Sequence, residues 1–176
     1  LRVQKAAGSV EITNDISKVY DGSAVSDVIY SRLSTGNVTV QYKSRDAADS
    51  DYTPQKPYAV GEYTVRVTVA ADGDYTAASA TRDFEITYLA APENPFAISG
   101  TEGTNDWHIS DVTITPPDGY TVSDALNGEY FANLTVSASA ENIKIYLKNE
   151  SGQMTDAISV GGIKIDKDDP VITATG

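Results

Sequence analysis

Apolar and polar residues alternate with a period of two through most of this chain. The clearest case is residues 61–70, in which apolar side chains occupy every second position: Tyr63, Val65, Val67 and Val69. A period of two places alternate side chains on opposite faces of a β-strand. We therefore predict a strand here, with its apolar face buried and its Thr and Arg residues on the other face.

The first half of the chain repeats this pattern in residues 9–13, 28–33, 37–43 and 84–88. Turn sequences separate these segments, with Asp-Gly at 21–22 and Asp-Gly-Asp at 72–74. Residues 44–56 are polar and rich in Asp, and we expect an extended loop there because of Pro54 and Pro57. No segment shows the 3.6-residue period of an amphipathic helix of useful length. Short strands joined by turns predict a β-sandwich.

The second half has the same character, with strands predicted at residues 112–115, 131–136, 143–147, 158–160, 163–165 and 171–173. The pair Gly161-Gly162 predicts a bulge or bend. Between the halves, Pro92 and Pro95 stop the preceding strand and stiffen the connection. We predict an all-β protein of two tandem immunoglobulin-like β-sandwiches, residues 1–90 and 91–176, joined semi-rigidly.

Length and charge limit the classes of function. The 176 residues suit two sandwiches of about 100 residues each. The net charge of −12 argues against binding to nucleic acid or an anionic membrane, since both need basic patches. The absence of cysteine excludes disulfides, thiolate zinc sites and a cysteine nucleophile. The sequence begins without Met, and we interpret it as part of a longer polypeptide.

Several short sequence motifs of the first half occur in a characteristic order. They are Lys18-Val-Tyr-Asp-Gly22, then Gly61-Glu-Tyr-Thr-Val65, then Asp74-Tyr75, then Phe84-Glu-Ile86. Together they resemble the YDG, or MBG-type, bacterial Ig-like repeats over about residues 9–88. That resemblance implies an Ig-like sandwich in a tandem-repeat protein, with no catalytic residues.

The second half carries a different set of phrases. Asp106-Trp107 is followed by Pro116-Pro-Asp-Gly-Tyr120, and the segment closes on Ile165-Asp-Lys-Asp-Asp-Pro170. These resemble a second bacterial Ig-like module, whose closing phrase is Ile-Asp-x-x-x-Pro. The resemblance implies long repeat-containing proteins on the surface of Gram-positive bacteria.

The sequence offers no clear set of residues with the types and spacing that catalysis requires. His108, the only histidine, has Ser110 and Asp111 close by, but neighbouring residues of a strand alternate faces and do not form a nucleophile–base–orienter chain. A glycosidase needs two carboxylates across a cleft. Many of the acidic residues instead lie in turn-like stretches, where Asp bonds to the backbone: Asp49, Asp51, Asp72, Asp74 and Asp118. We predict no catalytic residues and no enzyme activity.

Metal and ligand binding have better candidates. Asp166, Asp168 and Asp169 are the best calcium candidates, although the spacing is not that of an EF-hand and an acidic solvated hinge is the simpler interpretation. We predict no bound metal and no cofactor. Five aromatic residues in or near predicted loops offer a platform for sugar stacking: Tyr52, Tyr58, Tyr75, Trp107 and Tyr120. Tyr20, Tyr63 and Tyr88 are expected to be structural.

Two functions follow as hypotheses. The first is a non-catalytic stalk or spacer in a secreted or wall-attached bacterial protein, monomeric and flanked by neighbouring repeats of the same chain. The alternative is an adhesin-like module that binds a glycan or an extracellular matrix protein through its loop aromatics. Both place the chain outside the cell, without insertion into a membrane.

Overall fold

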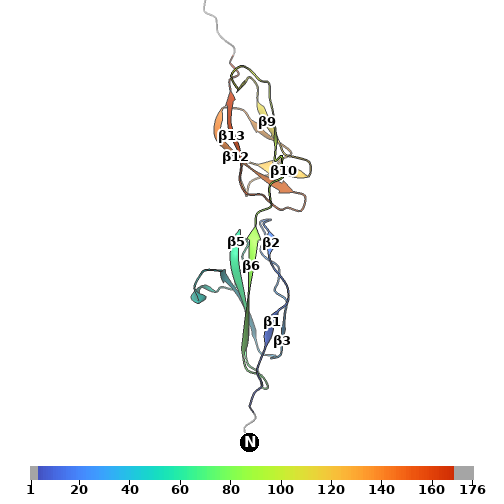
Figure 1. The fold of residues 1–176 in the computed structure, drawn as a ribbon, viewed down its shortest axis with the longest axis vertical. Coiled ribbons are helices and arrows are strands. Elements are labelled where there is room, and N and C mark those ends of the chain that lie inside the picture. Colours follow the sequence, from blue (N-terminus) through green and yellow to red (C-terminus); the bar gives the residue numbers. More distant parts are fainter. Residues whose placement is uncertain (1–3, 169–176) are drawn as a thin grey trace, which may run out of the picture. The chain divides into compact units, whose positions relative to one another are not determined.

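The computed structural model describes residues 4–168. It divides into two compact units, Leu1–Thr87 and Tyr88–Gly176. In the described range every regular element is a strand, apart from one short 3₁₀ turn (Figure 1). Strands of each unit form two sheets that enclose their own apolar core, which confirms the predicted all-β, Ig-like sandwich class. No helix among these residues is long and apolar enough to span a membrane.

Unit 1 is built from six strands in two sheets. The strands are β1 (Val10–Ile12), β2 (Lys18–Val19), β3 (Tyr30–Arg32), β4 (Val38–Ser44), β5 (Gly61–Val69) and β6 (Ala78–Thr87). One sheet has the order β2-β6-β5-β4, and the other is the antiparallel pair β1-β3. The 3₁₀ turn η1 (Asp49–Asp51) lies in the loop between β4 and β5, which projects to one side of the unit (Figure 1).

The core of unit 1 follows from the alternation in β5. Val65, Val67 and Val69 are fully buried on one face. In the antiparallel register Val67 lies opposite Val40, and Val65 lies opposite Tyr42. These cross-strand pairs bury apolar surface together, the main source of stability in a sheet.

Aromatic rings close this core beside β6. Tyr63 stacks on Phe84 with ring centroids 5.5 Å apart, and Tyr42 meets the same ring edge-on at 6.3 Å. Ile12 of the β1-β3 pair and Ile16 supply buried side chains from the opposite layer.

Unit 2 has seven strands in two sheets. The strands are β7 (Ala97–Ser99), β8 (Trp107–His108), β9 (Val112–Thr115), β10 (Tyr120–Ser123), β11 (Leu134–Val136), β12 (Ala140–Asn149) and β13 (Ile158–Ile165). The sheets have the orders β10-β12-β13-β8 and β11-β9-β7. Both contribute to one core of six buried side chains: Val112, Ile114, Val122, Ile145, Leu147 and Ile163.

The structure refines the strand predictions where backbone pairing decides. Residues 158–160 and 163–165 belong to one strand, β13, with Gly161 at φ +94°. The register with β12 shifts beside this glycine, which confirms the predicted bulge. β2, β7, β8 and β10 were not predicted. β2 and β8 are two residues long and β7 three, too short for alternation to stand out, whereas Tyr120 and Val122 of β10 do alternate with polar residues and this signal was missed. The predicted strand at 171–173 lies outside the described residues.

Candidate binding surfaces

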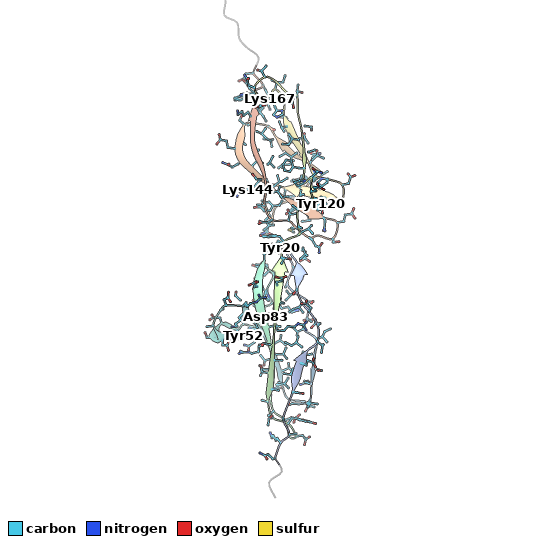
Figure 2. All side chains as sticks on the ribbon, viewed as in Figure 1. Tyr20, Tyr52, Asp83, Tyr120, Lys144 and Lys167 are labelled. Atoms are coloured by element: carbon cyan, nitrogen blue, oxygen red, sulfur yellow. The ribbon has the colours of Figure 1, made fainter. Side chains whose placement is uncertain are left out.

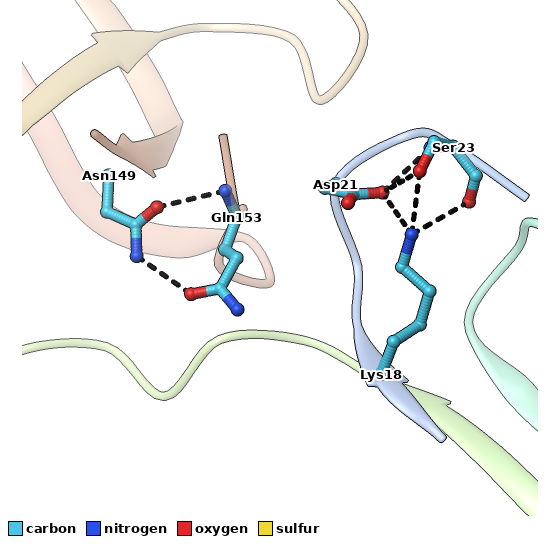
Figure 3. Close-up of polar contacts among 5 residues, drawn as sticks. All are labelled: Lys18, Asp21, Ser23, Asn149 and Gln153. Carbon is cyan, nitrogen blue, oxygen red and sulfur yellow. Dashed lines mark hydrogen bonds and ion pairs between the residues drawn. The ribbon is translucent and has the colours of Figure 1, made fainter. Parts of the chain in front are cut away.

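The Tyr-Asp-Gly phrase forms a hydrogen-bonded turn after β2. The Asp21 carboxylate accepts bonds from Lys18 Nζ at 2.6 Å, from the Ser23 amide at 2.8 Å and from Ser23 Oγ at 2.7 Å (Figure 3). Gly22 takes the left-handed φ of +79° that the turn requires. Tyr20 is buried, with 5% of its surface exposed. The Tyr-Asp-Gly motif therefore has a structural role.

The charge state of Asp21 reflects these contacts. Burial by itself raises the pKa of this carboxyl group, but the bonds from Lys18 and Ser23 outweigh it and lower the pKa from 3.8 to about 2. Asp21 is thus held as a carboxylate that stabilises its own turn.

A second aspartate has the same role between β5 and β6. Asp72 accepts bonds from the amides of Thr35, Asp74 and Tyr75 at 2.6 to 2.9 Å. These backbone bonds, that from Thr35 first, strongly lower its pKa. The structure therefore places Asp72 in a backbone-bonding role, as the sequence interpretation expected.

His108, Ser110 and Asp111 have separate environments. Ser110 Oγ donates to the Asp111 carbonyl at 2.8 Å and accepts a bond from the Thr101 amide at 2.8 Å. The Asp111 carboxylate pairs with Lys167 Nζ at 2.6 Å, and the hydrogen bond from Lys167 lowers its pKa. His108 Nδ1 is buried without a hydrogen-bond partner among the described residues. These contacts give no proton-transfer chain.

The calcium candidates are only partly described. Asp166 accepts a bond from the Asp168 amide at 3.0 Å, which is a local turn contact. Asp169 lies outside the described residues. Within the described range, no group of three or more His, Asp or Glu side chains is arranged to hold a metal ion.

The five candidate aromatic residues divide by exposure. Tyr52, on the projecting loop of unit 1 (Figure 2), is half-buried, and the Arg66 guanidinium lies 3.8 Å from its ring centroid. Tyr75 and Tyr120 are half-buried as well, Tyr75 in a bridge to Ala6 and Tyr120 in β10. Tyr58 and Trp107 remain open to solvent, with 56% and 40% of their surface exposed.

Tyr58 borders a hollow of about 490 Å³ in unit 1, between β4 and the projecting loop. Two other tyrosines line it. However, Tyr42 is 3% exposed, and Tyr63 packs on Phe84 and donates its hydroxyl to the Ala59 carbonyl at 3.0 Å. Because both rings hold the core, Tyr58 is the one exposed tyrosine that this hollow offers.

Trp107 lies on a hairpin of unit 2. The Gly103 amide donates to the Trp107 carbonyl, and the Ile109 amide donates to the Thr101 carbonyl. Asn105 and Asp106 both adopt positive φ, 55° and 61°, as the central residues of a primed turn do. The Asn-Asp pair is a sequence signal for such a turn, and this hairpin was not among the predicted elements.

A hollow of about 470 Å³ adjoins Trp107. Residues 139–141 at the start of β12 and 162–164 in β13 line the rest of it. These lining residues were not predicted from the sequence, because only the shifted register between β12 and β13 brings them together.

Comparisons with known proteins identify no family. No protein-family model matches the sequence, and no curated protein matches it. Among solved structures, the chain is similar to fibronectin(III)-like modules of CbhA from Clostridium thermocellum. The two share 13% identity over 96% of this chain and 100% of that chain, with a TM-score of 0.31. A likeness of this size establishes neither family membership nor function.

Proposed function

We propose that this chain is a pair of non-catalytic structural modules that serve as a stalk or spacer in a secreted or surface-attached bacterial protein. The bacterial surface setting comes from the resemblance of both halves to bacterial Ig-like repeats. The observation that supports the spacer role is the course of the chain: in each unit, the first and last described residues lie near opposite ends of the final strand.

In unit 1, the first described residues lie beside the beginning of β6. The Ala6 amide donates to the Asp74 carbonyl at 2.8 Å, and the Thr76 amide donates to the Ala6 carbonyl at 2.9 Å. The unit ends at Thr87, the last residue of β6. A strand rises about 3.3 Å per residue, so Ala6 and Thr87 are about 35 Å apart.

In unit 2, the same relation holds along β13. The Leu89 amide donates to the Met154 carbonyl at 2.9 Å, and Leu89 forms a parallel bridge with Thr155, shortly before β13 begins. The strand ends at Ile165. The chain therefore crosses this unit over about 33 Å as well.

The parallel pairing of β2 with β6 in unit 1 is of a kind that resists a pulling force along the chain. β2 runs parallel to β6, with Lys18 opposite Ile86 and Val19 opposite Thr87. A pull on the two ends slides parallel neighbours along their common axis, and their hydrogen bonds share the load. Antiparallel strands pulled apart from one end break their bonds one at a time. The observed arrangement therefore favours resistance to stretching.

Single-molecule stretching of the whole chain from its two ends tests the spacer role. We expect one unfolding step per unit, each lengthening the chain by roughly 270 Å, which is the extended length of about 87 residues at about 3.5 Å each less the ~35 Å that the folded unit already spans. Ala6→Pro removes the amide that bonds Asp74 and should lower the force of one step. Ala6→Gly keeps that amide and is the matched control. Stretching without distinct steps, or equal forces in both variants, would contradict the proposal.

A binding module is the second candidate function. The observation that favours it is Trp107, an exposed aromatic ring on a hydrogen-bonded hairpin and beside a hollow of ligand size. A spacer gains nothing from exposing the indole, whereas a ligand-binding surface does.

A further inference from the structure

The hollow beside Trp107 arises from the way three strands meet in unit 2. β8 lies parallel to the end of β13, with Trp107 opposite Lys164. On the other side of β13, Ala140 of β12 lies opposite Ile163. Cross-strand partners share a face of the sheet, so Trp107 and Lys164 stand together at one side of the hollow.

The hollow is widened because Gly162, which lines it, has no side chain. Gly162 is exposed in β13 and lines the hollow together with the buried Ile163. A methyl group placed on Gly162 would have its nearest neighbours at 3.6 Å, the Ala140 carbonyl oxygen, and at 4.0 Å, the Glu141 Cα. Both distances are ordinary van der Waals contacts. The glycine is therefore not demanded by packing, and its effect is to leave space beside the indole.

Polar groups of opposite charge line the same space. Glu141 and Lys164 are both exposed, and neither forms an ion pair with another described residue. Ser139 is already engaged, since its hydroxyl donates to the Ile165 carbonyl at 3.0 Å and accepts from the Ile165 amide at 2.8 Å. The hollow thus offers one aromatic face, one hydrogen-bond acceptor and one donor.

We propose that this hollow binds a neutral hexopyranose unit of a polysaccharide. The inference rests on the binding role given above as the second candidate function, and it supplies the site and the class of ligand. A pyranose ring has an apolar face of C–H groups, which packs on an indole, and a rim of hydroxyl groups. Those hydroxyls donate to a carboxylate such as Glu141 and accept from an ammonium such as Lys164.

The charge around the site selects against acidic sugars. Asp166 and Asp168 border a second hollow that Trp107 also lines, and residues 91–176 carry 13 acidic side chains against 4 basic ones. A negative field of this kind repels uronic or sialic acids. The volume of about 470 Å³ falls in the range of about 300–1,000 Å³ that is usual for small-ligand sites, which fits one or two sugar rings.

Trp107 is the only tryptophan, so its emission reports on the site directly. The full chain would be titrated with neutral hexaoses of glucose, mannose and galactose, and binding measured by fluorescence and by calorimetry. A uronic acid hexamer and an extended ten-residue peptide are the comparison ligands. Gly162→Val fills the hollow and leaves the indole in place. Gly73→Val is the matched control, because a methyl group on Gly73 has no neighbour within 4 Å.

We expect saturable binding of at least one neutral hexaose, weakened at least tenfold by Gly162→Val and unchanged by Gly73→Val. Circular dichroism checks that both variants fold. Equal affinity of Gly162→Val and the unaltered chain would overturn the site but leave the binding role standing. Binding of the uronic acid hexamer or of the peptide, without binding of any neutral hexaose, would overturn the proposal that the ligand is a neutral sugar. No calorimetric binding of any ligand would overturn both the site and the binding role.

Discussion

At the scale of single residues, Asp21 and Asp72 are best understood as parts of the turns that they stabilise. Asp21 accepts three hydrogen bonds from Lys18 and Ser23, Asp72 accepts two within its own turn and two from Thr35, and both have a lowered pKa. The turn signals in the sequence predicted this role, because Asp-Gly dipeptides combine a short acceptor side chain with a residue that tolerates positive φ. The number of acidic residues is therefore no sign of catalysis.

Asp21 gives unit 1 a defined dependence on pH. Its pKa is about 2 in the folded chain, against an ordinary value of 3.8. The stabilisation is present above pH 3.8 and is lost as the pH falls from 3.8 towards 2. Asp21→Asn should cost about 1–2 kcal/mol at pH 7, after allowance for partial exposure.

Calorimetry between pH 7 and pH 2.5 measures this effect. The unfolding temperature of the Asp21→Asn variant should lie below that of the unaltered chain at pH 7, and the difference should shrink below pH 3.8. Asp46→Asn, which changes an exposed aspartate of the same unit, is the control. A difference that stays constant with pH would show that Asp21 acts through packing and not through its charge.

At the scale of elements, the projecting loop of unit 1 is held on the outer face of its sheet. The Arg66 guanidinium lies 3.8 Å from the Tyr52 ring centroid and donates to Gln41 Oε1 at 3.0 Å. Thr53 also exchanges backbone bonds with Tyr42 at 2.7 and 2.8 Å. The alternation in β5 predicted a polar face towards solvent. In the folded unit, Arg66 on that face contacts Tyr52 of the loop and helps to hold the loop in place.

Removal of the Tyr52 ring should loosen the loop without unfolding the unit. A cation–π contact contributes about 0.5–2 kcal/mol, so Tyr52→Ala should speed tryptic cleavage after Arg45 several-fold. Tyr58→Ala removes an exposed ring of the same loop and should leave the cleavage rate unchanged. The rates follow from mass spectrometry of timed digests. Equal rates in the two variants would show that other contacts hold the loop, namely the backbone bonds of Thr53 and the ion pair of Lys43 with Asp49.

At the scale of the whole molecule, each unit has a separate core. Val67 of unit 1 and Leu147 of unit 2 are both fully buried, and each packs among side chains of its own unit. Cores of this kind unfold as separate cooperative units when few interactions join them.

We expect two thermal transitions that respond to different mutations. Leu147→Ala should cost about 2–5 kcal/mol by leaving a cavity, and Val67→Ala somewhat less. For a domain of this size, each kcal/mol lost from the free energy of unfolding lowers the unfolding temperature by roughly 4–8 °C. Val67→Ala should therefore lower one transition in scanning calorimetry and Leu147→Ala the other. If either variant moves both transitions by the same amount, the two units are energetically coupled.

The sequence alone determined the fold class, the long strands and the main turns. Alternation with a period of two is a local property, and β5, β9 and β12 lie where it predicted strands. The bulge at Gly161 was foreseen for the same reason, since two adjacent glycines weaken a strand wherever they occur.

The tertiary structure decided which residues share a surface. The five candidate aromatics were equivalent in the sequence, yet the fold places Tyr52 under Arg66 and leaves Trp107 in the open. Gly162 and Lys164 lie beside Trp107 only because β8 pairs with β13, about fifty residues away along the chain. Exposure and proximity depend on long-range strand pairing, which no local pattern encodes, and so the candidate site became visible only in the folded protein.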